Sequence, residues 1–340
     1  MTYRVAVIGT GGMGGLHSSQ WVDMPEAEVV GVLAESRDAA MRVAGEANCP
    51  AFGQDEFDAM LRQTRPDIVD ICVPTPVHRH YVERAAAAGK AVFVEKPLAR
   101  TLADCDAIVA AVERAGVPLM AGHVLRFFPE YAAATCLVDS GGVGKPAAIR
   151  TARMAGMPQG TGENGKTWYW DQAQSGGVVL DMIIHDFDWM RWTFGPVTRV
   201  FARGLYGKPL HTGLRDYALV TLRFESGAVG HVTGSWAHPG GFHTTLEIAG
   251  DAGIIEYDSA ASAPLRVSRK AAVGGGGGVA VPESPLAAEE SPYFLELRAF
   301  VHALQTGEAP PVTVYDAREA ARIALAALES METGKAVTLA

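Results

Sequence analysis

The fold of this chain is decided by residues 5–14, Val5-Ala6-Val7-Ile8-Gly9-Thr10-Gly11-Gly12-Met13-Gly14. The apolar first half predicts a strand buried on both faces, and the second half carries the pattern GxGxxG at the start of a segment that predicts a helix. Gly9 permits a tight turn, Gly11 leaves the backbone open to a pyrophosphate, and Gly14 lets the helix pack close to the strand. Unpaired N–H groups at the start of that helix would face the phosphates.

An acidic residue strengthens the prediction of a dinucleotide site. Residues Glu28–Leu33 predict a second strand, and Glu35 follows it, 21 positions after Gly14. A carboxylate near this spacing binds the adenosine ribose hydroxyls in dinucleotide-binding folds. The alternative is a tight strand-to-helix turn with a surface glutamate, but strand, glycines and acid together favour dinucleotide binding. Glu35 favours NAD, whereas Ser36 and Arg37 suit the 2′-phosphate of NADP, so NAD is the expected cofactor and NADP the alternative.

Strand and helix patterns alternate over the first 120 residues and then change. The alternation predicts a doubly wound parallel sheet, a Rossmann dinucleotide-binding domain of residues 1–122. From Val197 onward strands dominate, which predicts an α+β domain of residues 123–340 with a large, mostly antiparallel open sheet. We expect this second domain to bind substrate, and its C-terminal helix is a candidate to pack back on the first domain.

The carboxyl ends of the predicted parallel strands are where ligands collect in such sheets. The third strand ends in Pro74-Thr75-Pro76-Val77-His78 and the fourth in Glu95-Lys96-Pro97. Because proline fixes its own φ and restricts the preceding residue, Lys96 is held in place and is a candidate working group; the alternative is a loop lysine paired with Glu95. The candidate cofactor contacts are Gly9, Thr10, Gly11, Gly12, Met13, Gly14, Glu35, Ser36, Arg37, Pro74, Thr75, Pro76, His78, Glu95 and Lys96.

A second polar pattern lies in the apolar segment around residues 175–192. At helical spacing Asp181, His185, Asp188 and Trp192 share one stripe. Such a stripe is costly unless it lines a polar cavity or is fully hydrogen-bonded, so a catalytic reading and a structural network both stay open. The candidate substrate contacts are His123, Arg126, Trp168 and Trp170. Arg126 suits either an acidic substrate or a structural ion pair, and the tryptophans either wall a pocket or cover the sheet.

Composition narrows the class of protein. The chain has 340 residues with a formal net charge of −9, which argues against nucleic-acid or anionic-membrane binding. Its four cysteines include no CxxC pair, and neither a signal peptide nor a membrane span is evident, so a cytoplasmic protein is expected. Asp181, His185 and Asp188 lack an accompanying His/Cys set, so no metal is expected. The five-glycine run Gly274–Gly278 predicts a mobile loop.

Four motifs in order resemble the Gfo/Idh/MocA family of NAD(P)-dependent sugar and cyclitol oxidoreductases, the group of inositol 2-dehydrogenases and glucose–fructose oxidoreductase. They are the glycine turn at 9–14, the loop at 74–78, Glu95-Lys96-Pro97, and the segment from Gly176 to His185 that carries Asp181. The resemblance implies a dimer or tetramer formed through one face of the second sheet. It assigns the catalytic roles to Lys96, Asp181 and His185.

The activity implied by this resemblance is hydride transfer between a ring carbinol carbon and nicotinamide C4. His185 would be the general base, Asp181 would orient the base or bind a substrate hydroxyl, and Lys96 would stabilise the developing alkoxide. Two alternatives remain open at this stage. One is glycoside cleavage by transient oxidation with tightly held NAD, and the other is a non-catalytic sensor, against which the presence of all three residues argues.

Overall fold

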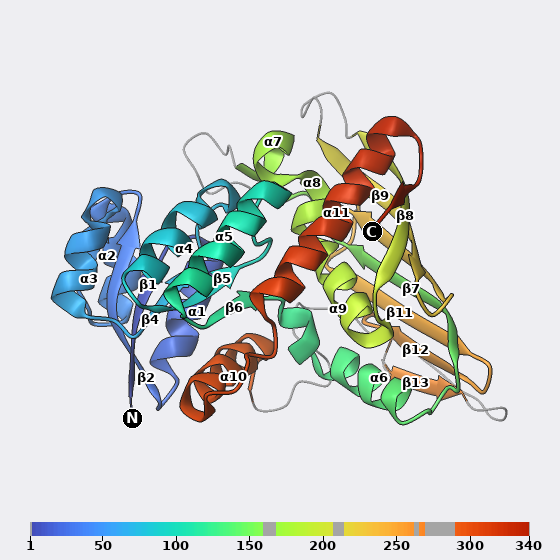
Figure 1. Cartoon of the computed structure of the whole chain (residues 1–340), viewed down its shortest axis with the longest axis horizontal. Helices are drawn as coiled ribbons and strands as arrows, with labels where there is room; N and C mark the ends of the chain where they lie inside the picture. The colour runs from blue at the N-terminus through green and yellow to red at the C-terminus, as the bar shows by residue number, and fades with distance from the viewer. Residues whose placement is uncertain (1, 159–167, 207–213, 262–264, 269–289, 340) are drawn as a thin grey trace. The chain divides into compact units, whose positions relative to one another are not determined.

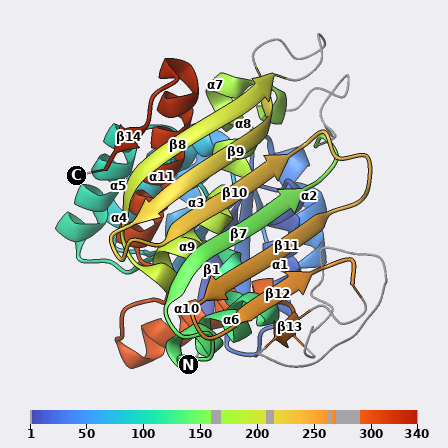
Figure 2. The ribbon, with the colours of Figure 1, turned by 90° about the vertical axis from the view of Figure 1, so that its right-hand side faces the viewer.

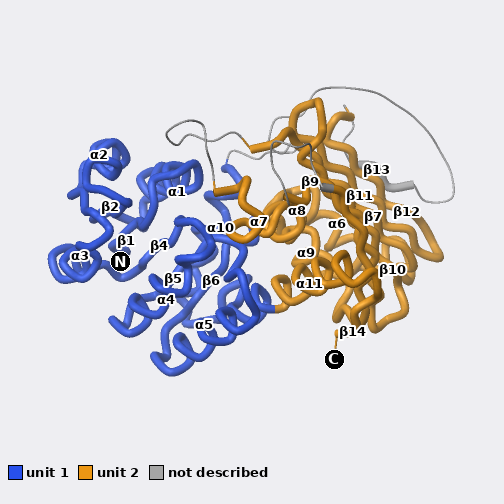
Figure 3. Tube along the Cα trace, turned by 90° about the horizontal axis from the view of Figure 1, so that it is seen from above, with its two compact units in different colours: residues 1–124, 290–318 blue, residues 125–289, 319–340 orange. Residues whose placement is uncertain are grey.

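The computed structural model describes residues 2–158, 168–206, 214–261, 265–268 and 290–339. These residues form two compact units, one of residues 1–124 with 290–318 and the other of residues 125–289 with 319–340 (Figure 3). The first division lies after residue 124, and residues 290–318 belong to the first unit. The run Gly274–Gly278 lies outside the described residues.

The first unit is built on six parallel strands that alternate with helices (Figure 1). In spatial order the strands are β3 (Ala51–Gly53), β2 (Ala27–Ala34), β1 (Tyr3–Ile8), β4 (Ile68–Ile71), β5 (Ala91–Glu95) and β6 (Leu119–Gly122). This order confirms the predicted doubly wound sheet. The three-residue strand β3 has no counterpart in the prediction, because so short a strand carries no periodicity.

Helices cover both faces of this sheet, because right-handed crossovers run outward from β1 in both directions. They are α1 (Gly12–Val22), α2 (Arg37–Glu46), α3 (Phe57–Thr64), α4 (His78–Ala87), α5 (Leu102–Ala115) and α10 (Pro292–Thr306). The late helix α10 returns to this unit: Ser291 donates to Gln20 of α1, and Phe300 packs edge-on against Phe93 of β5. Helix α11 (Val314–Thr333) begins in the first unit and ends in the second.

The second unit carries an eight-stranded sheet in which every pairing is antiparallel except that of β7 with β10. In spatial order its strands are β13 (Leu265–Ser268), β12 (Ile254–Asp258), β11 (His243–Gly250), β7 (Pro146–Met154), β10 (Val229–Ser235), β9 (Arg215–Phe224), β8 (Val197–Tyr206) and β14 (Val337–Thr338). The helices of this unit are α6 (Pro129–Asp139), α7 (Gln172–Ser175), α8 (Gly177–Asp181) and α9 (Ile184–Phe194). No described helix crosses the face of the sheet that Figure 2 turns to the viewer.

Strand β7 is a central strand that the sequence pattern misses. Its buried positions are Ile149, Thr151 and Arg153, so its inward face reads as polar rather than apolar. Arg153 is accommodated because its Nε donates to the Asp186 carboxylate at 2.7 Å, and both groups are buried. A buried, paired arginine removes the alternation on which strand prediction relies.

The continuous helical spacing predicted around residues 175–192 is wrong in one respect, because two helices occupy this segment instead of one. Helix α8 ends at Asp181, and α9 begins at Ile184. The amides of Met182 and Ile183 both donate to the carbonyl oxygen of Val178, which ends the regular ladder there. Asp181 and His185 therefore belong to two consecutive helices, and the shared stripe is interrupted between them. Across the described residues, no helix has the length and apolar character that a membrane crossing requires.

Candidate active site

The glycine turn after β1 has the geometry that its sequence predicts. Gly9 has φ +105°, and a Cβ there would lie 2.3 Å from the carbonyl oxygen of Cys72. A Cβ on Gly14 would lie 2.0 Å from the carbonyl oxygen of Gly9. A Cβ on Gly11, in contrast, meets no described atom within 4 Å. Two glycines are thus required by the fold, whereas Gly11 leaves room on the outside of the turn.

The first turn of α1 fits a pyrophosphate. Its N-cap, Gly11, makes no side-chain capping bond, and no acidic residue lies in the first turn. The first N–H groups of a helix have no intrahelical acceptor, and the helix dipole favours an anion there. Gly11 and Gly12 are exposed, so these groups stand where a dinucleotide phosphate can reach them.

The residues that decide between NAD and NADP follow directly after β2. Glu35 is exposed directly after the strand. Ser36 caps α2 by accepting the amide of Ala39 at 3.1 Å. The Arg37 guanidinium is held in an ion pair with Glu56, and this pairing raises the pKa of Arg37. Both residues that suit a 2′-phosphate are therefore engaged by other groups in this unit.

The loops after β4 and β5 are joined by His78. Its Nε2 lies 2.8 Å from the carbonyl oxygen of Val73, and its Nδ1 lies 3.0 Å from the carbonyl oxygen of Pro97. The ring is buried, and burial lowers the pKa of His78. Thr75 opens a short 3₁₀ turn, Thr75–Val77, in the same loop and is also buried. His78 thus fixes the loop that leads to α4 against the loop that contains Lys96.

Lys96 follows the last residue of β5, at the carboxyl edge of the sheet. Its side chain is half-buried, and the Lys96–Pro97 peptide bond is cis. Only β4 separates β5 from β1 in the sheet, so the glycine turn and Lys96 leave the same edge two strand spacings apart, roughly 10 Å. The amide of Lys96 donates to Glu95 Oε2 at 3.1 Å. One sheet edge therefore carries both the predicted phosphate site and the predicted catalytic lysine.

The second unit holds the other two predicted catalytic residues. Asp181 is the last residue of α8 and is 9% exposed, and His185 lies in the first turn of α9 and is half-buried. The third acid of the predicted stripe has a different partner. Asp188 is fully buried and accepts from Nε and Nη2 of Arg126 at 2.7 and 2.6 Å. Trp192 is exposed, and its ring lies 5.1 Å from the Arg126 guanidinium carbon.

The remaining candidate substrate contacts differ in exposure. His123 is fully buried directly after β6. Trp168 and Trp170 are half-exposed in a 3₁₀ turn, Trp168–Trp170, and the indole of Trp170 donates to the carbonyl oxygen of Pro158 at 2.9 Å. Trp168 stacks on Tyr169 with ring centroids 4.2 Å apart. Two of the four candidates thus present partly open aromatic surface.

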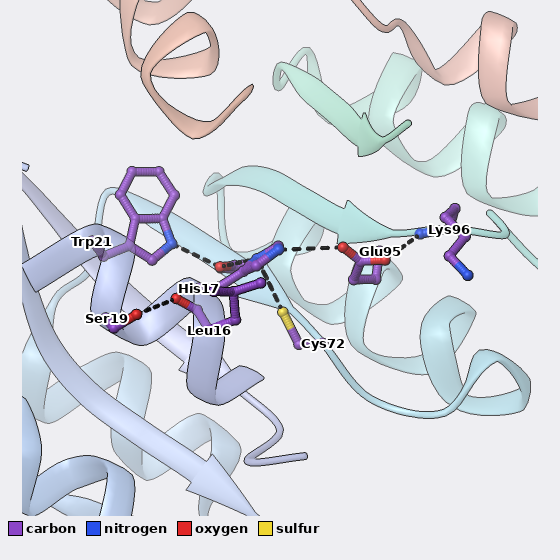
Figure 4. A network of polar contacts seen from close by, with 8 residues as sticks. Leu16, His17, Ser19, Trp21, Cys72, Glu95 and Lys96 are labelled. Carbon is purple, nitrogen blue, oxygen red and sulfur yellow. Dashed lines mark hydrogen bonds and ion pairs between the residues drawn. The ribbon is translucent and has the colours of Figure 1, made fainter. Parts of the chain in front are cut away.

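Sequence reasoning missed a buried polar cluster in the first unit that centres on His17 of α1 (Figure 4). His17 and Asp70 are both fully buried and lie 3.0 Å apart, although they are 53 positions apart in the chain. The available signal was a histidine that follows the glycine turn by only three positions. Its significance depends on partners from β4 and β5 that local sequence does not reveal.

A six-stranded parallel sheet with a glycine turn after its first strand is the architecture of a dinucleotide-binding domain. Two family models match the chain in order. The model for the oxidoreductase family with an NAD-binding Rossmann fold matches residues 3–123, and that for the Gfo/Idh/MocA C-terminal domain matches residues 131–256. The chain belongs to the Gfo/Idh/MocA oxidoreductase family.

The family assignment rests on relatives that align over nearly the whole chain. An NAD(+)-dependent scyllo-inositol 2-dehydrogenase of Bacillus subtilis is 31% identical, and the alignment covers 99% of this chain and 96% of that protein. A myo-inositol 2-dehydrogenase of Thermotoga maritima is 30% identical, with coverage of 99% and 98%. The crystal structure of a probable dehydrogenase of Thermotoga maritima matches with a TM-score of 0.83 and 28% identity over 98% of both chains.

Proposed function

We propose that this protein is an NAD-dependent dehydrogenase that oxidises a ring CH–OH group of a cyclitol, a sugar or a related polyol. The observation that carries the proposal is the carboxyl edge of the first sheet, where the glycine turn and Lys96 stand two strands apart. The inositol dehydrogenases among its relatives support the substrate class. The acidic net charge of −9 argues against nucleic acid or an anionic membrane surface as the partner.

The catalytic roles fall to Lys96, Asp181 and His185. NAD, held by the turn at residues 9–14, would supply the hydride acceptor for the carbinol carbon. His185 takes the hydroxyl proton, since imidazole is the side chain that titrates near neutral pH. Asp181 orients that imidazole or binds a neighbouring hydroxyl of the substrate. The Lys96 ammonium stabilises the alkoxide as it forms and lowers the pKa of the hydroxyl group.

The cofactor contacts follow the predicted set, with NAD preferred over NADP. The turn at residues 9–14 receives the pyrophosphate, Glu35 binds the adenosine ribose, and the loops at 74–78 and 95–96 flank the nicotinamide half. Glu35 repels a 2′-phosphate. The pairing of Arg37 with Glu56 and the capping role of Ser36 support the same preference. Fluorescence titration with NADH and NADPH tests it, and tighter NADPH binding would reverse it.

Among the candidate substrate contacts, Trp168 and Trp170 receive the strongest support, because their rings are partly open and carbohydrate rings stack on indoles. Arg126 serves a structural role in this proposal, since Asp188 accepts two of its hydrogen bonds. His123 is fully buried, so its ring has no open surface for a substrate to contact.

The assembly is a homodimer or homotetramer formed through the open sheet of the second unit. Phe201, Leu205 and Leu219 are 38, 64 and 44% exposed there. They alternate with buried residues along β8 and β9, so all three share one face of the sheet. The compartment is the cytoplasm, as supported by four cysteines that form no disulfide.

A substrate screen tests the reaction. Purified protein is incubated with NAD and with inositols, aldoses, sugar acids or dihydrodiols, and NADH formation is followed at 340 nm, its absorption band. Net NADH formation on free polyols supports a dehydrogenase. Cleavage of glycosides without net NADH formation would instead show that NAD is recycled within each turnover, and the proposal would be wrong.

A further inference from the structure

A buried polar cluster in the first unit links the cofactor-binding helix to the catalytic lysine. Its members are His17 and Trp21 on α1, Asp70 on β4, Cys72 just after β4, and Glu95 at the end of β5. Each is at most 9% exposed, and His17 and Asp70 are not exposed at all. Figure 4 shows the His17 ring between Trp21 and Glu95, with Cys72 beside the ring. Nothing in the proposed hydride transfer uses His17 directly.

The His17 ring bridges two carboxylates. Its Nδ1 lies 3.0 Å from Asp70 Oδ2, and its Nε2 lies 3.3 Å from Glu95 Oε1. Only the imidazolium form carries a proton on both nitrogens, so only this form suits both neighbours. Burial lowers the pKa of His17, but the buried Asp70 carboxylate beside the ring raises it, and the pKa lies well above its ordinary value. His17 is therefore the cation that balances the buried acids.

The Asp70 carboxylate anchors one side of the ring. It accepts the indole N–H of Trp21 at 2.7 Å and the thiol of Cys72 at 3.4 Å in addition to the His17 bond. Burial raises the pKa of the Cys72 thiol, so the sulfur stays protonated and donates. With three donors around Asp70, the ring of His17 has a fixed orientation, which leaves its Nε2 at ion-pair distance from Glu95 Oε1, 3.3 Å, but without hydrogen-bond geometry.

The Glu95 carboxylate carries the link onward to Lys96. Its Oε1 faces His17, and its Oε2 accepts the backbone N–H of Lys96 at 3.1 Å. The adjacent strand makes room for this carboxylate: Glu95 is opposite Gly122 in the pairing of β5 with β6. A Cβ on Gly122 would lie 2.8 Å from Glu95 Oε1. The position of the Glu95 carboxylate thus depends on the charge of His17 on α1 and on the absence of a side chain at Gly122 on β6.

We propose that His17 is a positioning residue for Lys96, acting by holding the Glu95 carboxylate against the Lys96 amide. The inference rests on the proposed function, because it assumes that Lys96 works on the substrate. A buried carboxylate without a cation either takes up a proton or turns toward water, and it then releases the amide that it accepts. The helix that receives the pyrophosphate and the lysine that acts on the substrate are in this way fixed by one chain of contacts.

Two substitutions of His17 test its two ring nitrogens separately. The amide nitrogen of asparagine in His17→Asn lies where Nδ1 lies and keeps a donor toward Asp70 only. The longer side chain of His17→Gln places its amide nitrogen near the position of Nε2 and keeps a donor toward Glu95. The proposal predicts that His17→Asn lowers kcat by on the order of 10- to 100-fold, with NADH affinity and KM within about threefold of wild type, and that His17→Gln restores most of kcat.

The decisive readout needs neither cofactor nor substrate. The measurement is the NMR resonance of the Lys96 amide in ¹⁵N-labelled protein, whose chain has a mass of 35.9 kDa. An amide proton that is hydrogen-bonded to a carboxylate resonates downfield. We expect the Lys96 amide resonance to move upfield in His17→Asn and to stay near its wild-type position in His17→Gln. Gly122→Ala should move it too, because the new Cβ displaces Glu95 Oε1 while His17 is intact. This second variant keeps the test valid if His17→Asn does not fold.

The control is Cys105→Ala, which opens the buried core of α5 in the same unit without touching the cluster; its Lys96 resonance and kcat should match wild type. An unchanged Lys96 resonance in both His17→Asn and Gly122→Ala would overturn the proposal. Equal kcat values in His17→Asn and His17→Gln would also overturn it. A bound stoichiometric metal that is lost in His17→Asn would do the same, since the ligand atoms of His17, Asp70 and Cys72 lie within 4.8 Å of one another. Turnover by Lys96→Ala would overturn the proposed function instead, and the resonance test would still stand.

Discussion

Lys96 combines a half-buried side chain with a backbone amide held by the preceding residue, Glu95. An ammonium group in a partly desolvated position stabilises a developing alkoxide more strongly than it would in water. The sheet determines where Lys96 lies, and its proposed chemical role is therefore tested by replacing its side chain.

Replacing Lys96 with alanine should lower kcat by on the order of 10²- to 10³-fold, as does loss of a donor that stabilises an oxyanion. The NADH dissociation constant should change little, because the glycine turn is untouched. Steady-state kinetics and fluorescence titration measure the two quantities. Lys145→Ala, which removes an exposed lysine of the second unit, is the control. Near-normal turnover by Lys96→Ala would remove Lys96 from the mechanism.

The pH dependence of stability should carry the signature of His17. A histidine whose pKa is raised by folding stabilises the protein fully below about pH 6.5, and that stabilisation is lost as pH rises through the folded-state pKa. The groups that face His17 are Asp70 and Cys72 on the β4 side and Glu95 on β5. Urea midpoints between pH 6 and pH 9 should therefore decline more steeply for wild type than for His17→Asn. Parallel curves would show that His17 does not carry this charge.

At the scale of the element, the turn between β1 and α1 divides its glycines into two kinds. Gly9 and Gly14 are required by close backbone contacts, whereas Gly11 borders open space among the described residues. The fold depends on Gly9 and Gly14, whereas the proposed cofactor site depends on Gly11, so substitutions can test the two requirements separately.

Gly11→Ala should fold normally and bind NADH at least tenfold more weakly, because its new methyl group occupies the space left for the pyrophosphate. Gly14→Ala should lose stability, because its Cβ would lie 2.0 Å from the carbonyl oxygen of Gly9. Thermal unfolding midpoints and NADH titrations of both variants provide the comparison. Wild-type NADH affinity in Gly11→Ala would exclude close approach of the pyrophosphate at this glycine.

At the scale of the whole molecule, each unit is built on its own sheet, and the two sheets differ in how they are covered. The parallel sheet is enclosed by helices on both faces, whereas the second sheet has helices α8 and α9 on one face and exposes large apolar residues on the other. An exposed apolar sheet face is typical of a surface that another chain covers.

Leu205→Asp combined with Leu219→Asp should convert the assembly to a monomer. Two charges at a buried apolar interface are left without partners and lose their hydration, so association is disfavoured. Light scattering coupled to size-exclusion chromatography gives the mass, and NADH titration shows whether the first unit is intact. An unchanged mass would place the interface on another surface, and a monomeric wild type would exclude this assembly.

Much of the first unit could be predicted from the chain alone. A strand such as Val5–Ile8 is apolar throughout because both of its faces are buried, and Gly9 and Gly14 mark a turn that no larger side chain fits. The second unit was less accessible. Strand β7 buries Thr151 and Arg153, so it lacks the apolar alternation that identifies a strand.

The sequence by itself determined the glycine turn after β1, the alternation that builds the parallel sheet, and the motif that places Lys96 after β5. These are local patterns, read from residues within a few positions of one another. Tertiary structure alone decided that Asp188 holds Arg126, 62 positions away, and that His17 stands between Asp70 and Glu95. The physical reason is that a buried charge is tolerated only with a partner, and partners are chosen by strand order and helix packing rather than by neighbouring residues.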